Sequence, residues 1–215
     1  RLFRNGLLVQ AWSGDLLKGT AAQTLETTIQ VVAGENRLSA YAFNHDNIKS
    51  LDARLLLNGA DILKRVGSVY VLAIGVGQYE NSQFNLNYPA ADASEIGAQL
   101  KDQQERLGHY SPIVTVPLIN TAATKANILL ALARLAGTNT GSLPPGAAPV
   151  LTKIKKAQPE DAVVIYFSGH GTAVDDRFYL IPHDLGYQGR RDQLDTAVGL
   201  KSILAHSVSD LDLED

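Results

Sequence analysis

The sequence predicts an α/β fold, built as an open, mostly parallel sheet with helices on both faces and preceded by a small all-β segment. Two observations predict it. Apolar, β-branched runs at 66–76, 112–119 and 162–168 alternate with helical patterns, as in a doubly wound sheet. Residues 1–65 instead combine alternating patterns with turn residues, which is typical of antiparallel strands. We therefore expect two parts, 1–65 and 66–215.

The all-β segment is predicted to hold strands at 24–32, 37–43 and 52–57. The first shows a period of two, and the Gly-Glu-Asn run at 34–36 predicts a turn before the second. Three strands are too few to close a sandwich, so we expect the C-terminal part of a β-sandwich-like module. Because the chain also lacks methionine, we expect an internal segment of a longer protein.

The α/β part opens with 66–76, an unbroken apolar run that is typical of a strand buried on both faces. Helices are predicted at 90–104, from apolar residues at helical spacing, and at 124–137, ended by a glycine in the C-cap place. A glycine- and proline-rich loop then leads to a short predicted helix at 150–157. At the end of the chain, 207–215 resembles an N-capped helix start.

The composition excludes several classes of function. The chain of 215 residues is 45% apolar and 19% charged with a net charge of −3, so no basic surplus indicates nucleic acid or an anionic membrane as a partner. No apolar run reaches the roughly 18 residues that span a bilayer, and no export signal is visible, which favours a cytoplasmic location.

A metal or cofactor is not expected. The chain has no cysteine, which excludes disulfides and thiolate ligands within it, and its five histidines lack metal-ligand spacing. Asp175 and Asp176 leave calcium as an alternative, although adjacent loop carboxylates are more often solvated turn residues.

The strongest chemical signal is Ser168-Gly169-His170-Gly171, directly after the strand at 162–168. Ligands of open α/β sheets bind at the carboxyl ends of the strands. An imidazole there can take and return a proton near neutral pH, and a neighbouring glycine N–H can face a developing oxyanion. The alternative is a loop histidine that merely closes a glycine turn.

Over 66–215 the order of motifs resembles the caspase/metacaspase clan of cysteine peptidases. The resemblance rests on VYVLAIGVGQY, a helix carrying Asp92, VVIYFSGHG, and FYLIPHDL with Pro182 and Asp184. It implies that His170 is the general base and that Gly171 supplies an oxyanion-hole N–H. It also implies a nucleophilic cysteine after the next core strand, roughly 50 residues beyond the histidine and so outside this sequence.

The same resemblance implies that Asp92 and Ser168 line the primary specificity pocket. A buried carboxylate needs a cationic partner, so we expect a substrate arginine or lysine. The alternative for Asp92 is that an aspartate in the first turn of a helix is favourable in itself. A caspase-type pocket for substrate aspartate is disfavoured because 66–105 contains no arginine, although Arg177, Arg190 and Arg191 leave an opening.

The expected function is that of a cysteine endopeptidase domain in a larger modular protein, with protein or peptide substrates that carry a basic cleavage residue. The other domains of the same chain are the expected partners. The alternative is a non-catalytic caspase-fold scaffold or interaction domain. A weaker alternative is an unrelated flavodoxin-like binding domain in which the Ser-Gly-His-Gly run is coincidental.

Overall fold

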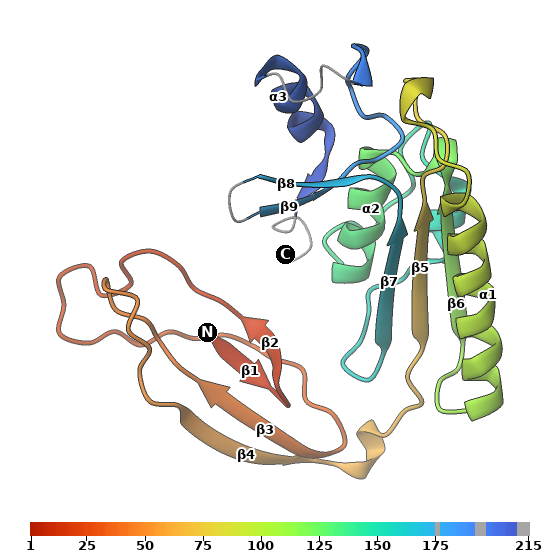
Figure 1. Ribbon diagram of the computed structural model, residues 1–215. Coiled ribbons are helices and arrows are strands. Elements are labelled where there is room, and N and C mark those ends of the chain that lie inside the picture. Colours follow the sequence, from red (N-terminus) through yellow and green to blue (C-terminus); the bar gives the residue numbers. More distant parts are fainter. Residues whose placement is uncertain (175–176, 192–196, 210–215) are drawn as a thin grey trace. The chain divides into compact units, whose positions relative to one another are not determined.

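A computed structural model describes residues 1–174, 177–191 and 197–209 (Figure 1). The chain divides into two compact units, Arg1–Arg65 and Val66–Asp215. The first is a four-stranded antiparallel sheet, and the second is mixed α/β, with a three-stranded parallel sheet and a small antiparallel sheet. The predicted α/β class is therefore confirmed at this level.

The β unit has the strand order β2-β1-β3-β4. The strands are β1 (Leu2–Arg4), β2 (Leu7–Gln10), β3 (Gly34–Ala40) and β4 (Ala53–Gly59), followed by a 3₁₀ turn, η1 (Asp61–Leu63). The predicted turn at 34–36 is wrong because Gly34 already pairs with Gly59 across β3 and β4. Much of this unit is exposed, including all but the last residue of β4.

The predicted strand at 24–32 is also wrong. This segment forms no regular strand, and side chains tether its backbone instead. The Arg4 guanidinium donates to the carbonyl of Gln30 at 2.5 Å, and the Asn36 side chain both accepts from the N–H and donates to the carbonyl of Val32, each at 2.8 Å. These bonds satisfy backbone groups that a sheet ladder would otherwise satisfy.

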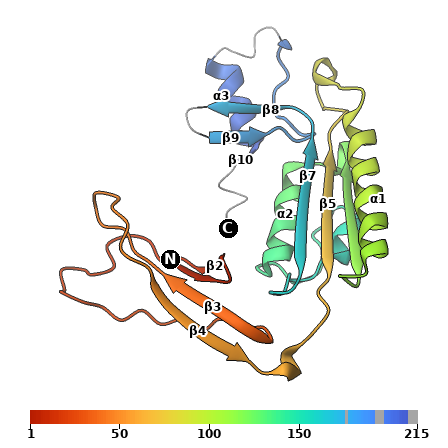
Figure 2. The ribbon, with the colours of Figure 1, turned by 60° about the horizontal axis from the view of Figure 1, so that its bottom comes forward.

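The parallel sheet of the second unit confirms the three predicted core strands. They are β5 (Val69–Gly75), β6 (Ile113–Ile119) and β7 (Ala162–Ser168), in the order β6-β5-β7. All seven residues of central β5 are buried, because helices cover both faces. The helices are α1 (Pro89–Leu107) and α2 (Lys125–Ala136), which lie on opposite sides of the sheet in Figures 1 and 2.

The alternation of side chains along β5 decides which helix each residue meets. Leu72 and Ile74 belong to the core that includes Ile128 of α2. On the other face, a Cβ added to Gly97 of α1 would lie 3.5 Å from the Cβ of Ala73. At the end of β5, a Cβ added to Gly75 would lie 2.4 Å from the backbone oxygen of Pro89, so only glycine lets α1 begin this close to the strand.

The remaining elements follow the sheet strands or join them. Short 3₁₀ turns are η2 (Ser82–Phe84), η3 (Asn120–Ala122) and η4 (Pro149–Lys153). The antiparallel sheet has the order β10-β9-β8, from β8 (Gly171–Val174), β9 (Arg177–Leu180) and β10 (Val208–Ser209), with α3 (Ala197–His206) before β10.

Two predicted helices need correction. The predicted helix at 150–157 is only the 3₁₀ turn η4, since Ile154 already has extended backbone. The predicted helix start at 207–215 is wrong where it can be seen, because Val208 is buried and pairs with Leu180 as a strand, while 210–215 lie outside the described residues.

Within the described ranges, none of the helices has the length and apolar character needed to span a membrane.

Candidate functional site

The site forms where the carboxyl ends of β5 and β7 lie side by side. Gly75 is in register with Ser168, and the N–H of Val76 donates to the carbonyl of Ser168 at 2.9 Å. The loop after β5 and the Ser168–Gly171 turn after β7 therefore start from neighbouring points. In an open α/β sheet this edge is the usual ligand-binding edge.

Tyr79, in the loop after β5, holds the turn that carries His170. The backbone N–H of His170 donates to the Tyr79 hydroxyl at 2.7 Å, and the two rings lie 5.2 Å apart between centroids. Tyr79 is only 4% exposed, and burial raises its pKa to about 12, against the opposing effect of the His170 N–H. The phenol therefore stays neutral. A Cβ at Gly169 would lie 3.0 Å from its hydroxyl oxygen, which favours glycine in the turn.

The His170 imidazole has a defined tautomer. Its Nε2 lies 2.9 Å from the carbonyl oxygen of Phe84 in η2. A carbonyl can only accept, so in the neutral ring Nε2 carries the hydrogen and Nδ1 carries the lone pair. Phe84 is buried, and its ring meets the imidazole edge-on with centroids 6.1 Å apart. The ring of His170 is thus oriented by a backbone atom and packed against two aromatic side chains.

Three influences act on the pKa of His170. Partial burial lowers it, the Phe84 carbonyl raises it by stabilising the protonated ring, and the Arg191 cation lowers it further. The net direction is downward. Arg191 also lies over the Phe84 ring, with its guanidinium carbon 6.0 Å from the centroid. The imidazole is therefore held neutral near pH 7, the state in which Nδ1 can accept a proton.

Gly171 opens β8, and its N–H direction follows from the strand register. The N–H of Ile181 donates to the carbonyl of His170 at 3.0 Å, and Gly171 is paired with Leu180. Antiparallel pairs alternate between hydrogen-bonded and non-hydrogen-bonded, so the Gly171–Leu180 pair is of the second kind. The N–H of Gly171 consequently points away from β9, next to the histidine and on an exposed residue.

Asp92 and Ser168, predicted to share a pocket, do line one. It is an open pocket of about 460 Å³, and the Ser168 hydroxyl donates to the Asp92 carboxylate at a long 3.4 Å. However, Asp92 is exposed in the first turn of α1, so the expected burial of this carboxylate is wrong. The full lining consists of Asn85, Leu86, Asn87, Tyr88, Pro89, Asp92, Ser168 and Gly169.

This lining contains no cationic residue. Arg191 lies over Phe84 instead, and Arg177 is exposed at the start of β9. The arrangement around Asp92 therefore suits a cationic group better than an anionic one. No metal-binding cluster of His, Cys, Asp or Glu occurs among the residues that the structure describes, and Asp175 and Asp176 lie outside them.

Three polar residues near the site were given no structural role from the sequence, although Tyr79 and Asp184 belong to the motifs that carry the resemblance. Asn120, with a positive φ of 50°, accepts from the N–H groups of Gly77 and Gln78. Asp184 accepts from the N–H of Lys125 at 2.8 Å and so caps α2 from a distant part of the chain. The Tyr79 hydroxyl accepts from the N–H of His170 and so holds the turn after β7. Such tertiary contacts leave no local pattern in a sequence.

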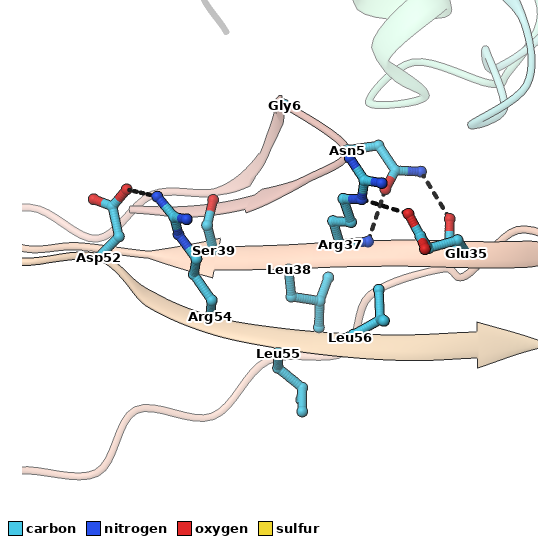
Figure 3. Close-up of a pocket in the computed structure, with 10 residues that line it drawn as sticks. All are labelled: Asn5, Gly6, Glu35, Arg37, Leu38, Ser39, Asp52, Arg54, Leu55 and Leu56. Carbon is cyan, nitrogen blue, oxygen red and sulfur yellow. Dashed lines mark hydrogen bonds and ion pairs between the residues drawn. The ribbon is translucent and has the colours of Figure 1, made fainter.

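A larger pocket, of about 850 Å³, lies in the β unit (Figure 3). Ion pairs join Arg37 to Glu35 and Arg54 to Asp52, so its cations already have carboxylate partners. Both arginine side chains are more than three-quarters exposed, and exposed pairs of this kind contribute little energy. The other lining residues are Asn5, Gly6, Leu38, Ser39, Leu55 and Leu56, which include no histidine to act as a base.

Comparison of the chain with protein-family models, with curated proteins and with solved structures finds no match in any of the three.

Proposed function

We propose that the second unit carries the general base and the oxyanion donor of a caspase- or metacaspase-like cysteine endopeptidase. The observation that carries the proposal is the bond from His170 Nε2 to the Phe84 carbonyl, which leaves Nδ1 as the basic nitrogen. Next to it, the N–H of Gly171 points away from its neighbouring strand. A base and a hydrogen-bond donor on consecutive residues are what acyl transfer requires.

In the proposed reaction, Nδ1 of His170 takes the thiol proton of a cysteine, and the thiolate attacks the substrate carbonyl. The N–H of Gly171 stabilises the oxyanion that forms. The imidazolium then returns its proton to the leaving amine, and water hydrolyses the thioester with the same base. The cysteine is the one that the resemblance places after a further core strand, because the 215 residues contain none.

The edge of β7 supports a further strand at that place. β7 is the last strand on its side of the described parallel sheet, and Val163 and Ile165 on it are 41% and 42% exposed. Apolar side chains on an unpaired strand edge favour addition of another strand. A strand added there parallel to β7, like the other strands of this sheet, would end at the same edge as β7, next to His170.

A basic substrate residue is the best fit to the adjoining pocket. Asp92 supplies a carboxylate and Ser168 a hydroxyl, and the lining includes no cation. The exposed position of Asp92 makes the attraction weaker than that of a buried ion pair. We therefore propose cleavage after arginine or lysine.

The test uses the longer protein that contains the cysteine, with fluorogenic peptides that end in arginine, lysine or aspartate. We expect cleavage of the basic peptides, and its loss in His170→Ala. His109→Ala, at an exposed histidine on the loop after α1, is the matched control and should retain activity. Activity that survives His170→Ala would exclude the mechanism, and cleavage after aspartate alone would exclude the Asp92 pocket.

The second candidate function is a non-catalytic scaffold with the same fold. It follows from the same site if the longer protein has no cysteine at the expected place, since a base alone performs no acyl transfer. The residue at the cysteine position in the longer protein decides between the two: an Asp-x-Cys sequence favours the peptidase, and any other residue there favours the scaffold.

A further inference from the structure

Tyr88 is an exposed aromatic residue in the lining of the pocket that contains Asp92. It immediately precedes α1, and its carbonyl accepts from the N–H of Asp92 at 2.9 Å. Residues four apart at a helix start lie on the same face, one turn from each other. The phenol ring and the carboxylate therefore border the same open space, with Ser168 also in the lining.

The exposure of this ring sets it apart from the other tyrosines of the loop and sheet. Tyr88 is 72% exposed, whereas Tyr70 is 5% and Tyr79 is 4% exposed. Covering a large exposed aromatic surface with a flat group removes it from water, which is favourable and lowers the free energy of the complex. Because the neighbouring Asp92 is negative, a planar cation is the group that satisfies both residues at once.

We propose that Tyr88 and Asp92 together make this pocket selective for arginine over lysine; this deepens the proposed function and rests on it. A guanidinium is planar and weakly hydrated, so it can stack on the phenol ring while its N–H groups donate to the carboxylate. The lysine ammonium is a compact, strongly hydrated point charge, which gains less from an exposed carboxylate. Selectivity therefore comes from the ring and attraction from Asp92.

The hydrogen bonds at the pocket fit the same occupant. The Ser168 hydroxyl donates to Asp92, which leaves the serine oxygen as an acceptor for a second guanidinium N–H. The side-chain oxygen of Asn85 already accepts from the N–H of Tyr79, so this amide is partly committed to the loop. The acceptors that remain therefore suit a cation with several donors and no acceptor, which describes arginine and lysine alike, so the choice between the two depends on the Tyr88 ring.

The first experiment measures kcat/KM for matched arginine and lysine peptides on the longer protein with the cysteine. We expect a preference for arginine of about two- to fivefold, the size that an exposed cation–π contact supports. Tyr88→Leu should abolish the preference and Tyr88→Phe should keep it, since the ring and not the hydroxyl stacks. Asp92→Asn should weaken cleavage of both peptides. A ratio that is unchanged in Tyr88→Leu overturns the inference.

The second experiment measures binding to the 215-residue chain itself, by NMR titration with N-acetyl-arginine amide, the lysine analogue, and the uncharged citrulline analogue. We expect the backbone amides of Asp92, Ser168 and Gly169 to shift with arginine, less with lysine, and not with citrulline. Equal shifts with lysine, or none with arginine up to its solubility limit, overturn the inference. Arginine binding together with a longer protein that cleaves no basic peptide would instead overturn the proposed function alone.

Discussion

The backbone N–H of His170 donates to the hydroxyl of Tyr79 at 2.7 Å, and this bond joins the turn after β7 to the loop after β5. The two residues are far apart in sequence and follow neighbouring strands of the parallel sheet. The position of the imidazole therefore depends on a phenol oxygen that is almost fully buried.

Tyr79→Phe tests this bond. The substitution leaves a partly buried N–H without its acceptor, which we expect to lower the free energy of unfolding by about 1–3 kcal/mol in chemical denaturation. Tyr88→Phe removes a hydroxyl from an exposed ring and serves as the control, with an expected change within about 0.5 kcal/mol. Equal stabilities of the two variants would contradict a role for the Tyr79 hydroxyl.

The second prediction concerns the titration of His170, followed by NMR at its ring protons. Burial and Arg191 outweigh the Phe84 carbonyl, so its pKa should lie below 6.5. Arg191→Gln should raise that pKa, whereas Arg106→Gln, at an exposed position on α1, should leave it unchanged. A pKa above 6.5 in the unsubstituted chain would mean that the Phe84 carbonyl outweighs burial and Arg191.

The same shift predicts how stability depends on pH. Because the pKa of His170 is lower in the folded chain, the unfolded chain binds more protons between the two values. The stability that this residue contributes is therefore fully present above about pH 6.5 and is lost as the pH falls through that value towards the folded pKa. Denaturation of the chain and of His170→Gln, compared from pH 7 to pH 5, should show a steeper fall for the unsubstituted chain.

Gly75→Ala should be among the most damaging single-methyl additions to the α/β unit. The new Cβ would lie 2.4 Å from the Pro89 backbone oxygen and 2.8 Å from the Cβ of Ala93, so α1 would have to shift. We expect a loss of about 1–3 kcal/mol or more in the free energy of unfolding. Gly141→Ala, where a Cβ meets no atom within 4 Å, is the matched control and should be near neutral.

Asp184→Ala should destabilise the start of α2, because the Asp184 carboxylate accepts from the N–H of Lys125. Loss of such a capping acceptor costs about 0.5–2 kcal/mol. Asp184→Asn keeps an acceptor oxygen of the same shape and should lose less. The comparison is made by thermal or chemical denaturation, and identical losses in the two variants would argue against a capping role.

The core of the fold could be predicted because burial leaves a strong pattern. β5 is an unbroken apolar run and all of it is buried, and Gly137 ends α2 with a left-handed backbone as expected. β7 is an equally apolar run and was correctly predicted as a strand, but none of its residues is fully buried because it lies at the edge of the described sheet. The segment at 24–32 has an alternating pattern but is not a strand. Alternation shows only that a segment could form a half-buried strand, and a strand also needs a partner strand to pair with. Its partners are the side chains of Arg4 and Asn36, which no periodicity reveals.

The candidate site was predictable only in part, for a related reason. The place of His170 follows from the strand that ends before it and the glycines beside it. The exposure of Asp92 depends on how α1 lies over the sheet, which its position in the helix does not determine. The contribution of Tyr79 required the two strand ends to be neighbours, a fact of topology.

The carbonyl that orients His170 has a practical consequence for genetics. Every amino acid has this oxygen, so substituting Phe84 changes the ring that packs on the histidine but never removes the acceptor itself. A mutational scan of the chain would thus report the base and miss its orienting partner. Finding that partner requires a change to the main chain itself. Either a residue is inserted or deleted around η2, or the peptide bond between Phe84 and Asn85 is replaced with an ester, whose carbonyl is a weaker acceptor.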